Sequence, residues 1–127
     1  WLKSDHSIIL SKVKEFLNKN IPVGAICAAT IALAKAGILN NFVHTSNDLD
    51  FLKQVCPEYT GEKNYRKEPS VSDRNLITAG GTAPVEFARE ILKKLDVINE
   101  EVLDTWYKLY KTQDAQYYFK LMQMLSA

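Results

Sequence analysis

The chain has 127 residues, 46% of them hydrophobic, and a formal net charge of +1. This length suits one hydrophobic core and is short for two domains, and the scattered Lys and Arg residues argue against a nucleic-acid or anionic-membrane surface. No apolar run reaches the roughly 20 residues of a membrane span, the start lacks a signal-peptide pattern, and Cys27 and Cys56 lack metal-site or disulfide-framework spacing. We therefore expect a reduced, cytoplasmic protein whose partner is a small molecule or a protein.

The first third of the chain predicts the order helix, strand, helix. Residues 5–19 carry apolar side chains at helical spacing. Pro22 prevents this helix from continuing, and the short apolar run IPVGAIC, residues 21–27, is typical of a buried parallel strand. The Ala- and Leu-rich segment 28–39 then predicts a helix that stops at Gly37.

The middle of the chain predicts shorter elements. DLDFLKQV, residues 48–55, has the periodicity of a short helix, whereas residues 58–69 are charged without an apolar period and should form an exposed excursion. Two short extended runs, PSVS and NLITAG, are separated by the dipeptide Asp73-Arg74. This pattern indicates either a hairpin or a strand reached through a turn.

The last third predicts helices. Gly80 and Gly81 lead through Thr82, a candidate cap, into a helix over 84–95. NEEVLDTWYKLYK and AQYYFKLMQML follow with helical spacing, and we expect their aromatic side chains to serve packing rather than cofactor binding.

Strands that alternate with helices predict an α/β fold with a largely parallel sheet. Only two convincing parallel strands are present, whereas such sheets usually have about four to six. We therefore predict the second half of a doubly wound domain, with the first strands upstream of Trp1. Residues 1–96 would belong to that domain, and 97–127 would be a helical extension packed on the domain or on a partner subunit.

Cys27 stands at the carboxyl end of the first predicted strand, where α/β sheets place their ligands. A nucleophile on a sharp strand-to-helix turn needs small neighbours two residues away, and Ala25 and Ala29 meet that need. A helix that begins at Ala28 directs its free N–H groups at the sulfur, which favours thiolate and provides donors for an oxyanion. The residues alone leave open a packing role for Cys27, which is the role we expect for Cys56.

The runs PVGAICAATIALAKAGILNNFVHTSN and DRNLITAGGTAPVEFAREIL resemble the ThiJ/PfpI family, a branch of the class I glutamine amidotransferase-like superfamily. The resemblance covers residues 1–96 and implies the C-terminal part of a flavodoxin-like, doubly wound three-layer sandwich. It also implies that Cys27 is the nucleophile and that the Ala28 N–H forms half of an oxyanion hole. The other half, and a Glu that binds the thiol, would lie upstream of Trp1.

The sequence departs from the protease-type members, which have His directly after the nucleophile where this chain has Ala28. That departure argues against a protease. Deglycase- or chaperone-type members have a small residue there and a His farther along, for which His44 is the match. His44 would act as general base or hydrogen-bond donor, the alternative being a residue satisfied by backbone groups, while Thr45, Gly80 and Gly81 would line the pocket.

These observations lead to three hypotheses. In the first, the Cys27 thiolate attacks a reactive carbonyl or an amide, on a small molecule or a protein adduct, without a cofactor or a metal. In the second, Cys27 is an oxidisable redox or stress sensor, and in the third the domain binds a ligand without turnover. The resemblance further implies a homodimer, to which the C-terminal helices could contribute.

Overall fold

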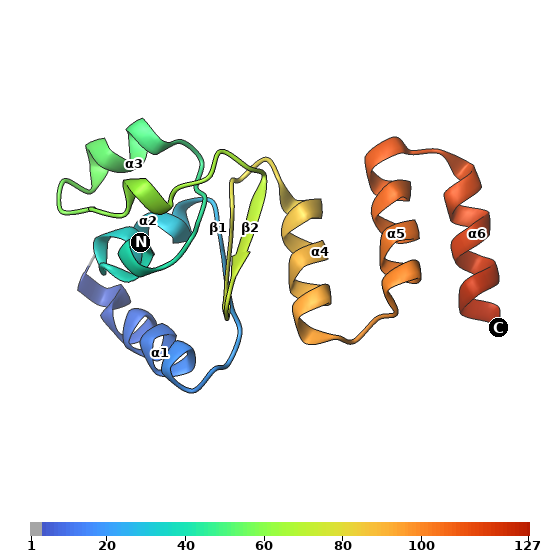
Figure 1. Cartoon of the computed structure of the whole chain (residues 1–127), viewed down its shortest axis with the longest axis horizontal. Helices are drawn as coiled ribbons and strands as arrows, with labels where there is room; N and C mark the ends of the chain where they lie inside the picture. Colours follow the sequence, from blue (N-terminus) through green and yellow to red (C-terminus); the bar gives the residue numbers. More distant parts are fainter. Residues whose placement is uncertain (1–3) are drawn as a thin grey trace.

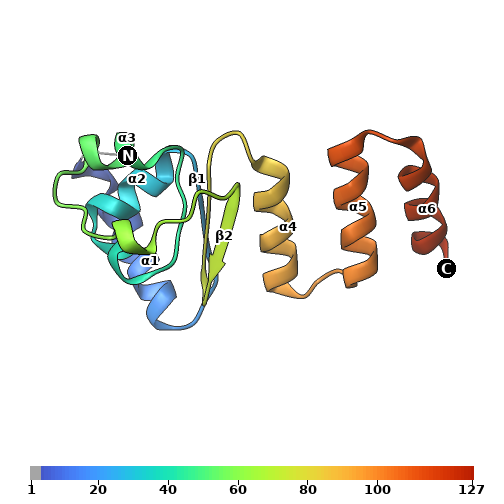
Figure 2. The same ribbon diagram turned by 45° about the horizontal axis from the view of Figure 1, so that its top comes forward.

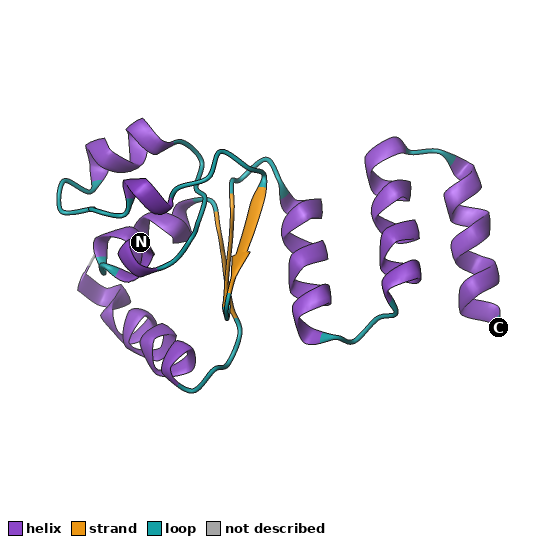
Figure 3. Ribbon diagram, viewed as in Figure 1, coloured by secondary structure: helices purple, strands orange, loops and turns teal. Residues whose placement is uncertain are grey.

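The computed structural model describes residues 4–127 as a helical layer, a three-stranded sheet and a series of helices on the opposite face (Figures 1 and 3). The elements and their bounds are α1 (Ser7–Asn18), β1 (Val23–Ile26), α2 (Ala28–Lys35), α3 (Leu49–Val55), β2 (Ser70–Asp73), β3 (Leu76–Ala79), α4 (Pro84–Leu95), α5 (Glu100–Thr112) and α6 (Ala115–Ser126). Short 3₁₀ turns cover Ser4–His6, Ile38–Asn41 and Glu62–Asn64. Among these helices, none has the length and apolar character to cross a membrane.

The sheet has the strand order β1-β3-β2. β1 runs parallel to β3, with Val23 opposite Leu76, and β2 runs antiparallel to β3. The two runs around Asp73-Arg74 therefore form a hairpin, with Arg74 at a φ of 53° in the turn. Within the described residues β1 lies at an edge of the sheet, and its carboxyl end faces the same way as that of β3.

The core lies between the sheet and the layer of α1, α2 and α3. β3 is buried along its whole length because it is the central strand and helices cover both of its faces. The apolar face of α4 packs on all three strands from the other side. The mixed α/β architecture confirms the predicted fold class.

The helices α4, α5 and α6 stand side by side in a row that leads away from the sheet (Figures 1 and 2). α5 packs on α4, and α6 packs on α5. Four large apolar side chains of α6 are 46–65% exposed: Tyr118, Phe119, Met122 and Leu125. α6 is the outermost described layer, so no other element within the described residues covers these side chains, and the predicted packing of this segment on a partner subunit stays a prediction.

Two local predictions need correction. The residue before α4 is Ala83, which caps it without a side-chain hydrogen bond, so Thr82 is not the cap, although Pro84 occupies the first helical turn as expected. In the charged segment 58–69, Tyr59 is only 7% exposed. A single aromatic side chain anchors this segment in the core, and a single residue leaves no periodic signal in the sequence.

Candidate functional site

The strand-to-helix turn at Cys27 has the strained backbone of an elbow. Cys27 has φ 58° and ψ −128°, a region that costs a residue with a Cβ about 1–3 kcal/mol. Its N–H donates to the Ala79 carbonyl at 3.0 Å, which extends the β1-β3 pairing by one residue. Its carbonyl accepts from both the Thr30 N–H (3.1 Å) and the Thr30 hydroxyl (2.6 Å). These bonds hold the backbone of the nucleophile candidate on both sides.

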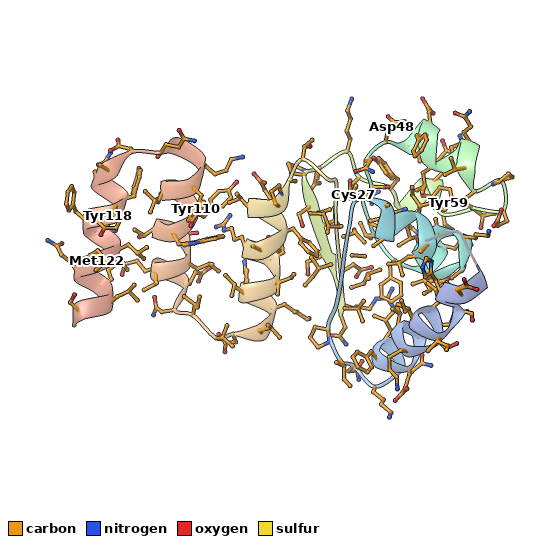
Figure 4. All side chains as sticks on the ribbon, turned by 180° about the vertical axis from the view of Figure 1, so that it is seen from behind. Cys27, Asp48, Tyr59, Tyr110, Tyr118 and Met122 are labelled. Atoms are coloured by element: carbon orange, nitrogen blue, oxygen red, sulfur yellow. The ribbon has the colours of Figure 1, made fainter. Side chains whose placement is uncertain are left out.

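The Cys27 side chain is exposed at the carboxyl end of the sheet, where Figure 4 labels it near Asp48. Gly81 lies directly against the sulfur, since a Cβ built on it would be 2.9 Å from Cys27 Sγ. A Cβ on Gly80 would instead meet the Ser46 carbonyl oxygen at 3.3 Å. The two glycines therefore have different functions: Gly81 leaves room for the sulfur, and Gly80 leaves room for the neighbouring loop.

The small residues of the elbow are placed as the turn requires. Ala25 is 4% exposed within the core, while Ala28 and Ala29 are partly buried in the first turn of α2. The first N–H groups of any helix lack an acceptor within it. At α2 these groups follow Cys27 directly, and the oxyanion role expected of the Ala28 N–H stays a prediction.

Asn47 is the side chain that contacts the sulfur, and sequence reasoning missed it. Its Nδ2 lies 3.6 Å from Cys27 Sγ, and its Oδ1 accepts from the Gly81 N–H at 2.7 Å. Asn47 is exposed and lies in an irregular segment, so no periodic pattern marks it. The sequence signal available was its position three residues after His44 in the run VHTSN.

His44 is fully buried, and both of its ring nitrogens are already bonded. Nδ1 lies 2.7 Å from the Phe42 carbonyl oxygen, which can only accept, so Nδ1 carries the proton. Nε2 then accepts from the Tyr59 hydroxyl at 2.6 Å. Burial is the main cause that lowers the pKa of His44 below 6.5, with a smaller contribution from Arg66, and burial raises the pKa of Tyr59 to about 12.

The structure thus gives His44 the contacts of a neutral, internal histidine. Its ring packs edge-on against Tyr59 and Tyr65. The main-chain N–H of His44 donates to the Asn64 carbonyl, and the Arg66 N–H donates to the His44 carbonyl. These bonds tie the segment that leads to Asn47 onto the excursion that carries Tyr59. The catalytic role inferred for His44 stays a prediction.

Thr45 and Ser46 fix the loop through hydrogen bonds as well as lining the cavity described below. The Thr45 N–H donates to the Thr78 hydroxyl at 2.9 Å, and Ser46 shares a 2.7 Å hydroxyl contact with Thr30. Thr30 also holds the Cys27 carbonyl. A buried polar network therefore joins the elbow, β3 and the loop before α3.

A cavity of about 360 Å³ adjoins this loop. Its lining includes Thr45, Asn47 and Gly80 from the elbow side and Glu86 and Lys111 from α4 and α5. Lys111 Nζ lies 2.6 Å from the Glu86 carboxylate, and this contact is the main reason that the pKa of Glu86 lies below 4.5. A helix of the C-terminal segment thus forms part of the cavity wall.

The described residues contain no group of three or more His, Cys, Asp or Glu side chains arranged to hold a metal ion. What the fold and the turn define is an α/β protein with an exposed cysteine on a strained strand-to-helix turn. Residues 3–94 match the DJ-1/PfpI family, and the chain belongs to that family. The predicted ThiJ/PfpI resemblance is confirmed.

Two curated proteins of Bacillus subtilis (strain 168) are similar to this chain. One, described as the uncharacterized protease YoaZ, is 52% identical over 126 residues, which are 99% of this chain and 60% of YoaZ. The other, described as the uncharacterized protease YdeA, is 37% identical over 116 residues, which are 91% of this chain and 57% of YdeA. The chain therefore spans less than two thirds of the length of these relatives.

Two solved structures share the fold. A ThiJ/PfpI family protein from Bacillus anthracis superposes with a TM-score of 0.94 at 49% identity, over 97% of this chain and 58% of that one. The DJ-1 superfamily protein Atu0886 from Agrobacterium tumefaciens superposes with a TM-score of 0.71 at 40% identity, over 80% of this chain and 53% of that one. The likeness includes α5 and α6 in the first case, since 97% of the chain is covered.

Proposed function

We propose that the protein uses Cys27 as a nucleophile toward an electrophilic carbonyl, such as a reactive dicarbonyl, a glycated adduct or an amide. The sulfur forms a C–S bond while the carbonyl electron pair moves to oxygen, where the Ala28 N–H stabilises it. The oxygen then takes a proton from water, which completes the adduct. This step needs no metal and no redox partner.

The observation that carries the proposal is the conformation of Cys27. Backbone strain persists only where the surrounding structure enforces it, and it concentrates at functional sites. A cysteine that merely fills the core has no need of a φ of 58° or of an exposed sulfur with a glycine against it. Cys56 provides the contrast, since it is fully buried and its thiol donates to the Ile31 carbonyl at 3.6 Å.

The test compares Cys27→Ser with Cys56→Ser in the full-length protein, with methylglyoxal as substrate and iodoacetamide as alkylating probe. We expect Cys27→Ser to abolish both dicarbonyl turnover and alkylation at the elbow, and Cys56→Ser to preserve both. Dicarbonyl turnover at the wild-type rate in Cys27→Ser would refute the enzyme proposal. Alkylation of wild-type Cys27 at the rate of a free cysteine would refute activation of the sulfur.

A peptide substrate belongs in the same assay because the curated relatives are described as proteases. We expect no peptide hydrolysis, since Ala28 offers no imidazole next to the sulfur and both nitrogens of His44 are bonded elsewhere. The redox alternative is tested by mass spectrometry after treatment with peroxide. A stable sulfinate on Cys27 in a protein that turns over no carbonyl would favour the sensor.

We also propose that an upstream segment completes the domain, as the length of the relatives suggests. The outer edge of β1 would pair with a further strand. Beside it lies an apolar cavity of about 490 Å³, lined by Ile8, Ile9, Phe16 and Val23 among others. Hydrogen–deuterium exchange should show slow exchange of the β1 amides in the full-length protein and faster exchange in residues 1–127 alone. Equal exchange would contradict the proposal.

The expected homodimer is proposed to use the outer face of α6. The only charged residue of helix α6 is Lys120, and it pairs with Glu101 of α5. Two copies of the outer face of α6 would therefore meet without like-charge repulsion. Met122→Glu should convert the dimer to a monomer in sedimentation experiments, while Gln123→Glu on the same helix serves as control. A wild-type protein that sediments as a monomer would exclude the dimer.

A further inference from the structure

The side chain of Asn47 bridges the sulfur and the turn that faces it. The loop around Asn47 is fixed on both sides, by the contact of Ser46 with Thr30 and by Asp48, whose carboxylate caps α3 by accepting from the Phe51 N–H at 2.8 Å. Little rotation of the Asn47 backbone is therefore possible. The Asn47 side chain is exposed, but the backbone that carries it is held in place.

The orientation of the Asn47 amide follows from its partners. The Gly81 N–H can only donate, so the atom 2.7 Å from it must be Oδ1. This places Nδ2 toward Cys27, where its N–H donates to Sγ at 3.6 Å. The amide is thus oriented by the main chain, and its donor faces the atom that would react.

A donor in this position affects the two forms of the sulfur differently. A hydrogen bond to an ionised acceptor is about twice as strong as one between neutral groups, so the contact favours thiolate over thiol. Among the described residues, Asn47 has the side-chain donor that reaches the sulfur. The ring of His44 is committed to Phe42 and Tyr59.

We propose that Asn47 is a catalytic residue that stabilises the Cys27 thiolate through its Nδ2–H, with Gly81 fixing the amide in that orientation. This inference rests on the proposed nucleophilic role of Cys27. An amide does not titrate, so it supports the thiolate equally across neutral and alkaline pH.

The test uses Asn47→Ala, Asn47→Asp and, as matched control, Asn75→Ala in the full-length protein. Asn75 also donates from its side chain, to Asn20 at 3.1 Å, but lies at the opposite end of β3. The rate of iodoacetamide alkylation of Cys27 is measured against pH, together with methylglyoxal turnover and thermal unfolding. The isosteric Asn47→Asp keeps an oxygen for the Gly81 N–H and so preserves the fold.

At neutral pH we expect Asn47→Ala to slow alkylation about tenfold. Asn47→Asp should slow it further, because it places a negative charge against the thiolate. The differences should narrow at alkaline pH, where the thiol ionises in every variant, and Asn75→Ala should match the wild type. If Asn47 had only a structural role, its variants would have a lower unfolding temperature, and their alkylation rates would not approach the wild-type rate at alkaline pH.

Wild-type alkylation rates in both Asn47 variants at every pH would overturn the inference. This outcome is distinguishable from failure of the proposed function. If Cys27→Ser is inactive while the Asn47 variants are unaffected, only the role of Asn47 fails. If Cys27→Ser retains turnover, the nucleophile itself is wrong.

Discussion

Gly81→Ala tests directly how the turn after β3 leaves the sulfur accessible. A Cβ at this position would lie 2.9 Å from Cys27 Sγ and 3.2 Å from Cys27 Cβ, whereas non-bonded carbon atoms prefer separations of about 3.5–4.0 Å. The sulfur must therefore leave its rotamer, at a cost of about 0.5–1.5 kcal/mol. At about 1.4 kcal/mol per factor of ten, this corresponds to roughly 2- to 12-fold slower alkylation of Cys27.

The matched control is Gly37→Ala, at the end of α2. Gly37 has φ 73°, and the nearest atom to an added Cβ is 3.9 Å away, so the cost is conformational and not steric. We expect a loss of about 1 kcal/mol in the free energy of unfolding with unchanged alkylation. Denaturant unfolding and stopped-flow alkylation measure the two effects separately. Wild-type alkylation and stability in Gly81→Ala would refute the idea that this glycine is required for the sulfur.

Two further predictions concern titrating groups. Burial lowers the pKa of His44 below 6.5, so the unfolded chain binds a proton more readily than the folded protein does. The free energy of unfolding should therefore decrease as pH falls through 6.5 toward the lower pKa of the folded state. His44→Gln should make this decrease smaller. Urea unfolding against pH measures it, and equal slopes in both proteins would contradict it. Lys111→Met should raise the pKa of Glu86 toward 4.5, since Lys111 is the main cause of its depression, whereas Lys108→Met should not. NMR titration of the Glu86 carboxyl carbon decides this, and an unchanged pKa would show that the ion pair does not persist in solution.

Most of the local architecture was predictable because it depends on short-range chemistry. The apolar run before Cys27 forms β1, and Gly37 adopts the left-handed conformation that ends its helix segment. The small residues around Cys27 are enough to indicate the elbow, since a sharp strand-to-helix turn excludes larger side chains. The local prediction that was wrong is Thr82 as the cap of α4. Capping propensity identifies a suitable residue type, but it does not determine at which backbone position the helix begins.

The surroundings of the sulfur were not predictable in the same way. His44 and Asn47 stand three residues apart in one irregular segment, and a sequence pattern does not tell which of them faces Cys27. Which of the two side chains faces the sulfur depends on two distant partners. The Tyr59 hydroxyl binds the His44 ring in the interior, and the Gly81 N–H orients the Asn47 amide. Both partners are distant in sequence, and a single long-range hydrogen bond produces no periodic pattern from which it could be predicted.

The sequence by itself therefore determined the elements, the α/β class and the cysteine at the elbow, because each follows from periodicity or from the size of adjacent residues. The tertiary structure alone decided that Asn47 contacts the sulfur, that His44 is internal, and that Lys111 reaches a cavity beside the elbow. Those contacts depend on long-range hydrogen bonds and on helix packing, in which the partner of a residue is set by the fold and not by its neighbours in the chain.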